Sequence, residues 1–172
     1  NVEKEFSFSE SASVPVGKYN FPQFVAHLNT SESKKLSLGI DSYVGSFYDG
    51  SRLTAGLEPL WNIGSSLQLG LAYEYNHVSF PARNQTFTGN IGRIKALLML
   101  NTKLSLSTFV QYNSSENTLS TNIRFRYNPR EGNDFYIVLN DGRSTYRDLE
   151  DPRLPAFSNR SILLKYTYTF IL

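Results

Sequence analysis

Two histidines are the side chains best suited to acid–base chemistry near neutral pH, and one of them has a hydroxyl nearby. His77-Val78-Ser79 places an imidazole and a hydroxyl on the same face if the segment is a strand, because residues two apart share a side. A His beside a Ser supports nucleophilic hydrolysis when a carboxylate orients the ring. Glu74 has the opposite parity, so the sequence favours a polar rim position for His77, and His27 fits a position that lines a polar interior.

Metal and thiol chemistry have less support. The chain has 0 cysteines, which excludes disulfides, thiolate ligands and a cysteine nucleophile. No acidic segment has EF-hand spacing and no histidine pair has zincin spacing. Four aspartates lie in or beside predicted turns, where Asp is common for backbone reasons: Asp49, Asp134, Asp141 and Asp151. We therefore expect no cofactor, no metal and no catalytic activity.

A larger group of ionisable residues alternates with apolar residues along the chain. Alternation places them on the polar face of their strands, opposite the leucines and tyrosines. They are Asp41, Glu58, Glu74, Arg93, Lys95, Arg124, Arg126 and Lys165. In a narrow interior such charges should pair across the space, because unpaired ions there are costly. In a wider, water-filled pore their excess of cations would favour the passage of anions.

Strands must position these side chains, and a period of two runs through most of the sequence. It is clearest in segments 67–76, 119–128 and 161–172, where a helical period of 3.6 would mix the two faces. The same pattern elsewhere predicts about ten strands. They lie near 2–9, 19–29, 35–47, 52–63, 67–79, 87–100, 103–113, 118–128, 133–142 and 160–172.

Strand length and face composition point to a membrane. Many predicted strands are as long as the ~9–11 residues that cross a bilayer, against ~5–6 in ordinary sheets. The chain is 40% hydrophobic and 14% aromatic but only 19% charged, below the ~25% of soluble domains. One face carries Leu, Ile, Val, Tyr and Phe, which suits lipid. The other carries Ser, Thr, Asn, Gln and Gly, which suits a hydrated interior.

Loop lengths and aromatic positions agree with a transmembrane β-barrel. If the last strand ends at the inner side, the short connections 30–34, 64–66, 101–102 and 129–132 share that side. The longer 10–18, 80–86 and 143–159 lie outside, together with the short 48–51 and 114–117. Rings near strand ends predict two interfacial belts. These rings are Tyr75 and Tyr112 on the outer side, and Trp61, Tyr127 and Phe170 on the inner side.

Charge and segment length exclude other classes. A net charge of +2 without charge runs gives no reason to expect nucleic acid. The longest aliphatic run, 96–100, is far short of the ~20 residues of a membrane helix. No signal peptide occurs at Asn1, so we expect that any export signal has been removed or lies outside this chain.

Several strings resemble the C-terminal region of a large outer-membrane family of Bacteroidota. They are 47–50, 59–61, 73–76 and 110–114, and above all 124–135, Arg-Phe-Arg-Tyr-Asn-Pro-Arg-Glu-Gly-Asn-Asp-Phe. In that family a domain like the family-9 carbohydrate-binding modules precedes a long domain of uncharacterised function. The resemblance covers about 14–172 and implies that this chain is a fragment, or a barrel completed by another segment, since family members are several times longer. It assigns no sugar-binding role to any residue here.

The sequence therefore predicts an all-β chain whose residues 1–172 form one antiparallel transmembrane β-barrel of about ten strands, or the C-terminal part of a larger barrel. The expected function is a non-catalytic, porin-like channel, or a membrane anchor of a surface assembly, in the outer membrane of a Gram-negative bacterium. Expected partners are outer-membrane lipid and other surface proteins. Two alternatives remain open: an outer-membrane lipid hydrolase that uses His77 and Ser79, and a soluble β-sandwich binding module.

Overall fold

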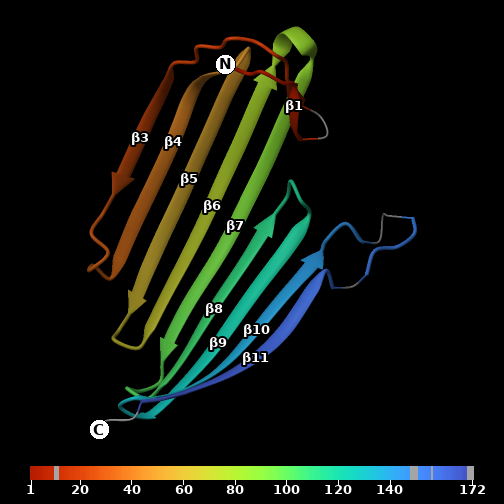
Figure 1. The fold of residues 1–172 in the computed structure, drawn as a ribbon. Helices are drawn as coiled ribbons and strands as arrows, with labels where there is room; N and C mark the ends of the chain where they lie inside the picture. The colour runs from red at the N-terminus through yellow and green to blue at the C-terminus, as the bar shows by residue number, and fades with distance from the viewer. Residues whose placement is uncertain (10–11, 148–150, 156, 170–172) are drawn as a thin grey trace.

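The computed structural model describes residues 1–9, 12–147, 151–155 and 157–169, which form two antiparallel sheets (Figure 1). The small sheet pairs β1 (Phe6–Ser9) with β2 (Ala12–Val14). The large sheet has nine strands in the order of the sequence. These are β3 (Gln23–Asn29), β4 (Leu36–Phe47), β5 (Gly50–Ile63), β6 (Leu67–Phe80), β7 (Gln85–Met99), β8 (Leu104–Asn113), β9 (Thr118–Arg130), β10 (Asn133–Ser144) and β11 (Asn159–Tyr168).

Tight turns join most neighbouring strands, and their backbone explains their residue types. Tyr48 and Asn117 adopt positive φ angles of 53° and 50° between β4 and β5 and between β8 and β9. Gly132, at 78°, reverses the chain between β9 and β10. Asn and Gly tolerate this region best, which accounts for Asn117 and Gly132 at these turns. The 3₁₀ helix η1 (Pro81–Arg83) joins β6 to β7.

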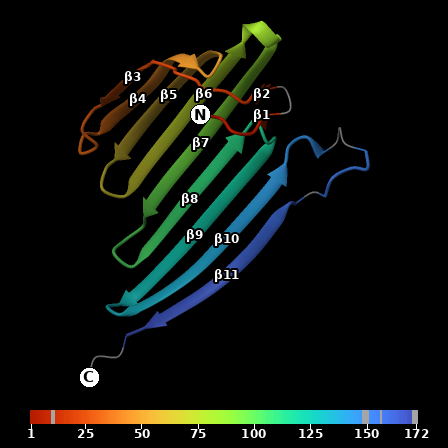
Figure 2. The same cartoon turned by 45° about the horizontal axis from the view of Figure 1, so that its top comes forward.

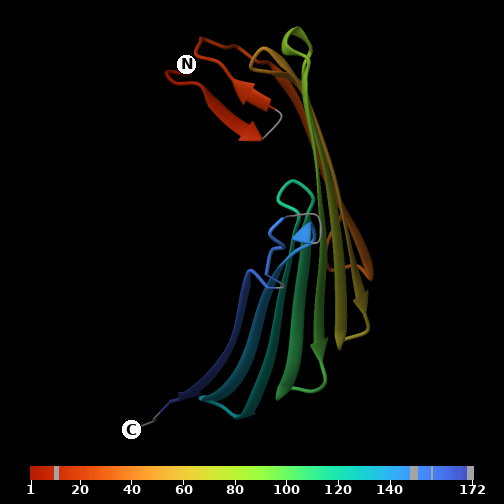
Figure 3. The same ribbon diagram turned by 90° about the vertical axis from the view of Figure 1, so that its right-hand side faces the viewer.

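The large sheet is a single curved layer, and the β1–β2 hairpin stands on its concave side at the upper end (Figures 2 and 3). Ala12 and Val14 of the hairpin pack against Val78 and Phe80 of β6, and these four are the buried hydrophobic residues of the described chain. The Arg83 guanidinium also donates to the Ser13 carbonyl. The described core is therefore a small cluster where the hairpin meets the sheet.

The convex face of the sheet has no second layer over it among the described residues. Leu71 is 48% exposed and Ile94 is 47% exposed, although both lie in the middle of central strands. Soluble domains rarely expose a contiguous apolar surface of this extent. No helix in the described part of the chain has the length and hydropathy needed to cross a bilayer.

The all-β, antiparallel prediction is confirmed, but the predicted closure into a barrel is not found. The edge strands β3 and β11 do not pair with each other. The predicted first strand, 2–9, lies outside the large sheet because Phe6–Ser9 folds back on Ala12–Val14. The predicted strand at 19–29 begins only at Gln23, after Pro22, whose ring lacks a donor for a strand ladder. Nine strands remain, so β3 and β11 run in the same direction.

Most connections between neighbouring strands are short at both ends of the sheet, and one long span stands apart. The lower end has the turns 64–66, 100–103 and 131–132, together with 30–35. The longest span between strands of the large sheet, 145–158, leaves β10 and enters β11 at the upper end of these strands, and η1 also lies at the upper end of the sheet (Figure 1). The turns 48–49 and 114–117, also at the upper end, are shorter than 30–35 at the lower end, so the predicted division into short and long loops is met only by the span 145–158.

Candidate functional site

The eight ionisable residues predicted to line a polar interior all lie on one face of the sheet. Directly opposed residues of neighbouring strands share a face, so the register assigns each of them. Asp41 opposes Gly56, which opposes Glu74, and Glu58 is two residues from Gly56. The register from β7 to β11 places the other five on the same face: Arg93, Lys95, Arg124, Arg126 and Lys165. Val78 and Phe80 belong to this face too, and the hairpin that covers them identifies it as concave.

A chain of polar contacts, made of hydrogen bonds and one ion pair, crosses four strands on the concave face. Arg52 Nε donates to Thr54 Oγ1 at 3.0 Å, and Thr54 Oγ1 donates to Asn76 Oδ1 at 2.7 Å. Asn76 Nδ2 in turn donates to Glu74 Oε1 at 2.7 Å.

The chain continues beyond Glu74 through an ion pair. Glu74 Oε2 lies 4.0 Å from Arg93 Nη2, and Arg93 Nε donates to Gln111 Oε1 at 3.0 Å. We call the set Arg52, Thr54, Asn76, Glu74, Arg93 and Gln111 the polar ladder. Thr54 is only 4% exposed, so the ladder holds fixed polar groups on a surface that is open elsewhere.

Charge is divided across the concave face. The carboxylates Asp41, Glu58 and Glu74 lie on β4, β5 and β6, whereas the five predicted cations lie on β7, β9 and β11. Only some of these groups are paired: Arg126 Nε lies 2.7 Å from Asp134 Oδ1, and His27 Nδ1 lies 2.5 Å from Asp41 Oδ1. Among the described residues, no ion pair involves Lys95, Arg124 or Lys165. The prediction that the interior charges pair is therefore only partly met in the open sheet.

A hollow of about 310 Å³ lies at the acidic side of the ladder. Tyr43, Arg52, Glu58 and Glu74 border it, and Gly56 is part of its lining. A side chain at Gly56 would meet only ordinary contacts, since a Cβ there would be 3.5 Å from the Cβ of Asp41. Within the described residues, no group of three or more metal-ligating side chains is placed to hold a metal ion.

The predicted belt aromatics lie on the opposite, convex face. Trp61 is near the lower end of β5 and Tyr127 near the lower end of β9, and they are 53% and 40% exposed. Tyr112 is the penultimate residue of β8 at the upper end. Tyr75 lies further from its strand end, because β6 continues to Phe80. Phe170 lies outside the described residues.

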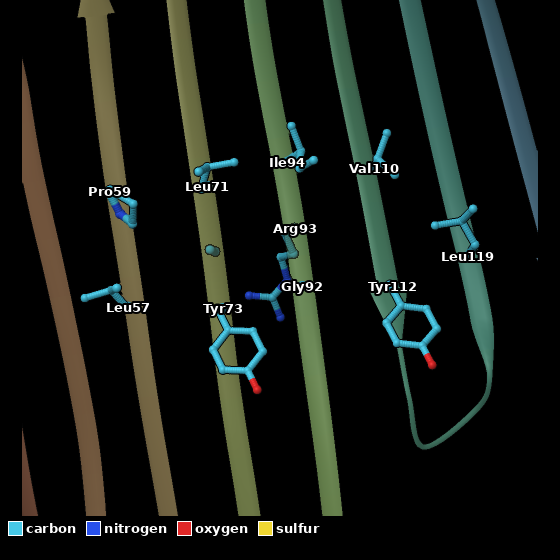
Figure 4. Close-up of a pocket in the computed structure, with 11 residues that line it drawn as sticks. Leu57, Pro59, Leu71, Tyr73, Gly92, Arg93, Ile94, Val110, Tyr112 and Leu119 are labelled. Atoms are coloured by element: carbon cyan, nitrogen blue, oxygen red, sulfur yellow. The ribbon is translucent and has the colours of Figure 1, made fainter. Parts of the chain in front are cut away.

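A groove of about 500 Å³ crosses the convex face between two tyrosines (Figure 4). Tyr73 and Tyr112 stand on either side of Gly92, and a Cβ at Gly92 would have no neighbour within 4 Å. The Tyr73 hydroxyl donates to Asn90 Oδ1 at 2.7 Å, which fixes the position of one wall. Leu71, Ile94 and Val110 add apolar side chains to the lining, and Arg93, a residue of the concave face, also borders the groove.

His77, the candidate base of the hydrolase alternative, lies beside a hydroxyl, whereas hydrolysis requires a carboxylate that orients the ring. His77 Nδ1 lies 2.9 Å from Thr88 Oγ1, and the His77 ring is parallel to that of Tyr75, with centroids 6.3 Å apart. Its hydrogen-bond partner among the described residues is thus a hydroxyl and not a carboxylate. The geometry adds no support to the hydrolase alternative.

Sequence reasoning missed several members of the polar ladder. Arg52, Thr54, Asn76 and Gln111 were not among the predicted site residues, although each shares a face with Glu74 or Arg93. The parity of the strands was the signal that could have found them. Parity also places Asp141 on the convex face, with Arg143 and Arg160, where the sequence led us to expect apolar residues.

Comparisons with models of known protein families, with curated proteins and with solved structures gave no match. The resemblance of 124–135 to an outer-membrane family therefore stays a prediction.

Proposed function

We propose that this chain forms wall strands of a β-barrel in the outer membrane of a Gram-negative bacterium and acts there, without catalysis, as a porin-like channel. The observation that carries the proposal is the contrast between the faces of one curved layer. Large apolar side chains such as Leu57 (46% exposed) and Ile94 (47%) stand uncovered on the convex side, while the polar ladder lies on the concave side. Lipid outside and water inside would satisfy both faces.

Strand length supports the same environment. β4 to β11 have between 10 and 15 residues each. Such strands, tilted by ~35–45°, span the ~25 Å apolar band of outer-membrane barrels. A soluble β-sandwich would need a second sheet over Leu71 and Ile94, and the described chain offers none.

The polar face supports passage of small solutes. The cations on β7, β9 and β11 outnumber the carboxylates on β4, β5 and β6, so a lumen built from this wall should prefer anions. The residues assigned to this preference are Arg93, Lys95, Arg124, Arg126 and Lys165.

Two measurements on the full-length chain test the proposal. After refolding in the presence of phosphatidylcholine vesicles, the protein should float with the vesicles and resist extraction by carbonate or urea. In planar bilayers it should give stepwise conductance. Release by carbonate alone would overturn the membrane assignment. Stable insertion without any conductance would overturn the channel and leave anchoring of a surface assembly as the role of the barrel.

A further inference from the structure

A charged cluster interrupts the apolar convex face where β10 and β11 approach their upper connection. Asp141 opposes Arg160 across the two strands, and Arg143 lies two residues beyond Asp141, so all three share the convex face. Arg143 is the penultimate residue of β10, and Arg160 is the second residue of β11. The neighbouring convex residues further down the strands are apolar, among them Leu139 and Ile162.

One carboxylate holds both guanidinium groups. Arg143 Nε lies 2.6 Å from Asp141 Oδ2, and Arg160 Nε lies 2.7 Å from Asp141 Oδ1. The Asp141 side chain is 8% exposed, whereas those of Arg143 and Arg160 are 50% and 44% exposed. Each arginine donates a hydrogen bond from its Nε to Asp141. No described residue accepts a hydrogen bond from the Nη nitrogens of either arginine.

A phenylalanine ring fixes the same two groups from another side. The guanidinium carbon of Arg160 lies 3.5 Å from the centroid of the Phe157 ring, and that of Arg143 lies 4.9 Å from it. Stacking on an aromatic ring restrains a guanidinium while it leaves the edge of the group open to an anion. Two cations and one carboxylate also leave the cluster with a net positive charge.

We infer that Arg143 and Arg160 form a binding site for the phosphate group of an anionic lipid. Paired guanidinium donors match phosphate oxygens in geometry and charge. The cluster is near the strand ends, as Tyr112 is in β8, and in the proposed barrel strand ends lie at the level of the lipid headgroups. This inference rests on the proposed function, because only a membrane-inserted wall brings headgroups to the convex face.

The test compares charge-matched variants of the full-length protein. The variant R143Q/R160Q removes two cations from the convex face, and R124Q/K165Q removes two from the concave face of neighbouring strands. Both are refolded in phosphatidylcholine vesicles, and flotation shows whether they insert. Binding of phosphatidylglycerol is then measured by titrating it into the detergent-solubilised proteins and following bound lipid by native mass spectrometry. R143Q/R160Q should bind phosphatidylglycerol about tenfold more weakly than the wild type, and R124Q/K165Q should not differ from it.

Insertion of all three proteins with equal lipid affinity would overturn the site and leave the proposed barrel intact. Failure of all three to insert would instead count against the barrel itself. A third variant, R143K/R160K, keeps the charge but loses the bonds from Nε to Asp141, so it separates a shaped site from diffuse attraction. Weak binding by R143K/R160K is expected, and wild-type affinity in it would overturn the geometric argument.

Inorganic phosphate serves as the probe for the other source of the same chemistry. At the concentration that saturates binding of phosphatidylglycerol, it should leave the thermal unfolding midpoint of the wild type unchanged. An equal stabilisation by phosphate and by phosphatidylglycerol would overturn the assignment to a lipid in favour of a site for free phosphate.

Discussion

The concave and convex faces of the sheet are made by the same strands, often by adjacent residues, yet the side chains of the two faces differ in pairing and exposure. On the concave face Glu74 accepts a hydrogen bond from Asn76 and forms an ion pair with Arg93. On the convex face its neighbour Tyr73 is 52% exposed and borders a groove that no described residue fills. The comparison agrees with the proposed barrel: the polar ladder pairs side chains on the concave face, whereas the ion pairs of the convex face are confined to the cluster at Asp141 among the described residues.

The largest effect should come from a charge on the convex face. Ile123→Arg on β9 would place a guanidinium against lipid, and we expect it to lower the free energy of unfolding in phosphatidylcholine vesicles by about 2–4 kcal/mol. Urea titration followed by tryptophan fluorescence measures this. Ser120→Arg is the matched control, because Ser120 is on the concave face of the same strand. This substitution should lower the free energy of unfolding only slightly. Equal losses in the two variants would mean that the faces do not differ in environment.

Breaking the polar ladder should have the next largest effect. Thr54→Val removes the hydroxyl that joins Arg52 to Asn76, and the loss in unfolding free energy should be about 1–3 kcal/mol, because Thr54 is buried and its partners lose a bond. Thr108→Val makes the same change on the convex face, where the described residues provide no side-chain bond to Thr108. Its effect should be within about 0.5 kcal/mol. Denaturant unfolding in detergent compares the two, and a larger loss for Thr108→Val would contradict this view of the faces.

Ion selectivity should respond more modestly. Replacing Arg124 and Arg126 by Ser should reduce the anion-to-cation permeability ratio by about twofold, measured as a reversal potential under a salt gradient. Most of the change should come from Arg124, because Arg126 is already neutralised by Asp134. Glu58→Gln on the acidic side should move the ratio in the opposite direction. A ratio unaffected by any of these changes would show that these residues do not line the path.

The smallest effect should come from the exposed pair on β3 and β4. His27→Ala removes the contact with Asp41, but both side chains are well exposed, at 50% and 38%. The change in unfolding free energy should stay below about 1 kcal/mol, as for most surface ion pairs. A thermal melt of the vesicle-bound protein at neutral pH measures it. A greater loss would place the His27 and Asp41 pair in a drier setting than the open sheet suggests.

The strands and their faces could be predicted from the sequence because a period of two is a local signal. Leu67 to Tyr75 alternates cleanly, and β6 covers that segment with the expected face assignments. All eight predicted interior charges share the concave face for the same reason. The turns followed from residues that tolerate positive φ, such as Asn117 and Gly132.

What the sequence did not predict depends on contacts between distant segments. Phe6–Ser9 has the composition of a wall strand, but packing of Val14 against Val78 and Phe80 draws it into the hairpin instead. Strand parity places the members of the polar ladder on one face, but which of them meet depends on the register of four strands, which single-strand parity does not supply. The cluster at Asp141 was overlooked because an alternating pattern encourages the assumption that every residue of one face is apolar.

The odd number of strands in the large sheet limits what can complete a ring. Each neighbouring pair from β3 to β11 is antiparallel, so a seam that joined these two edges directly would have to be parallel. If two copies inserted in the same orientation formed a ring together, both seams between them would also be parallel. A single added strand that runs opposite to β3 and β11 would make every seam antiparallel. Three or five added antiparallel strands would do the same. Strand parity therefore makes an odd-numbered insert the natural complement of this wall, with Phe24 and Leu164 at the two edges as its first neighbours.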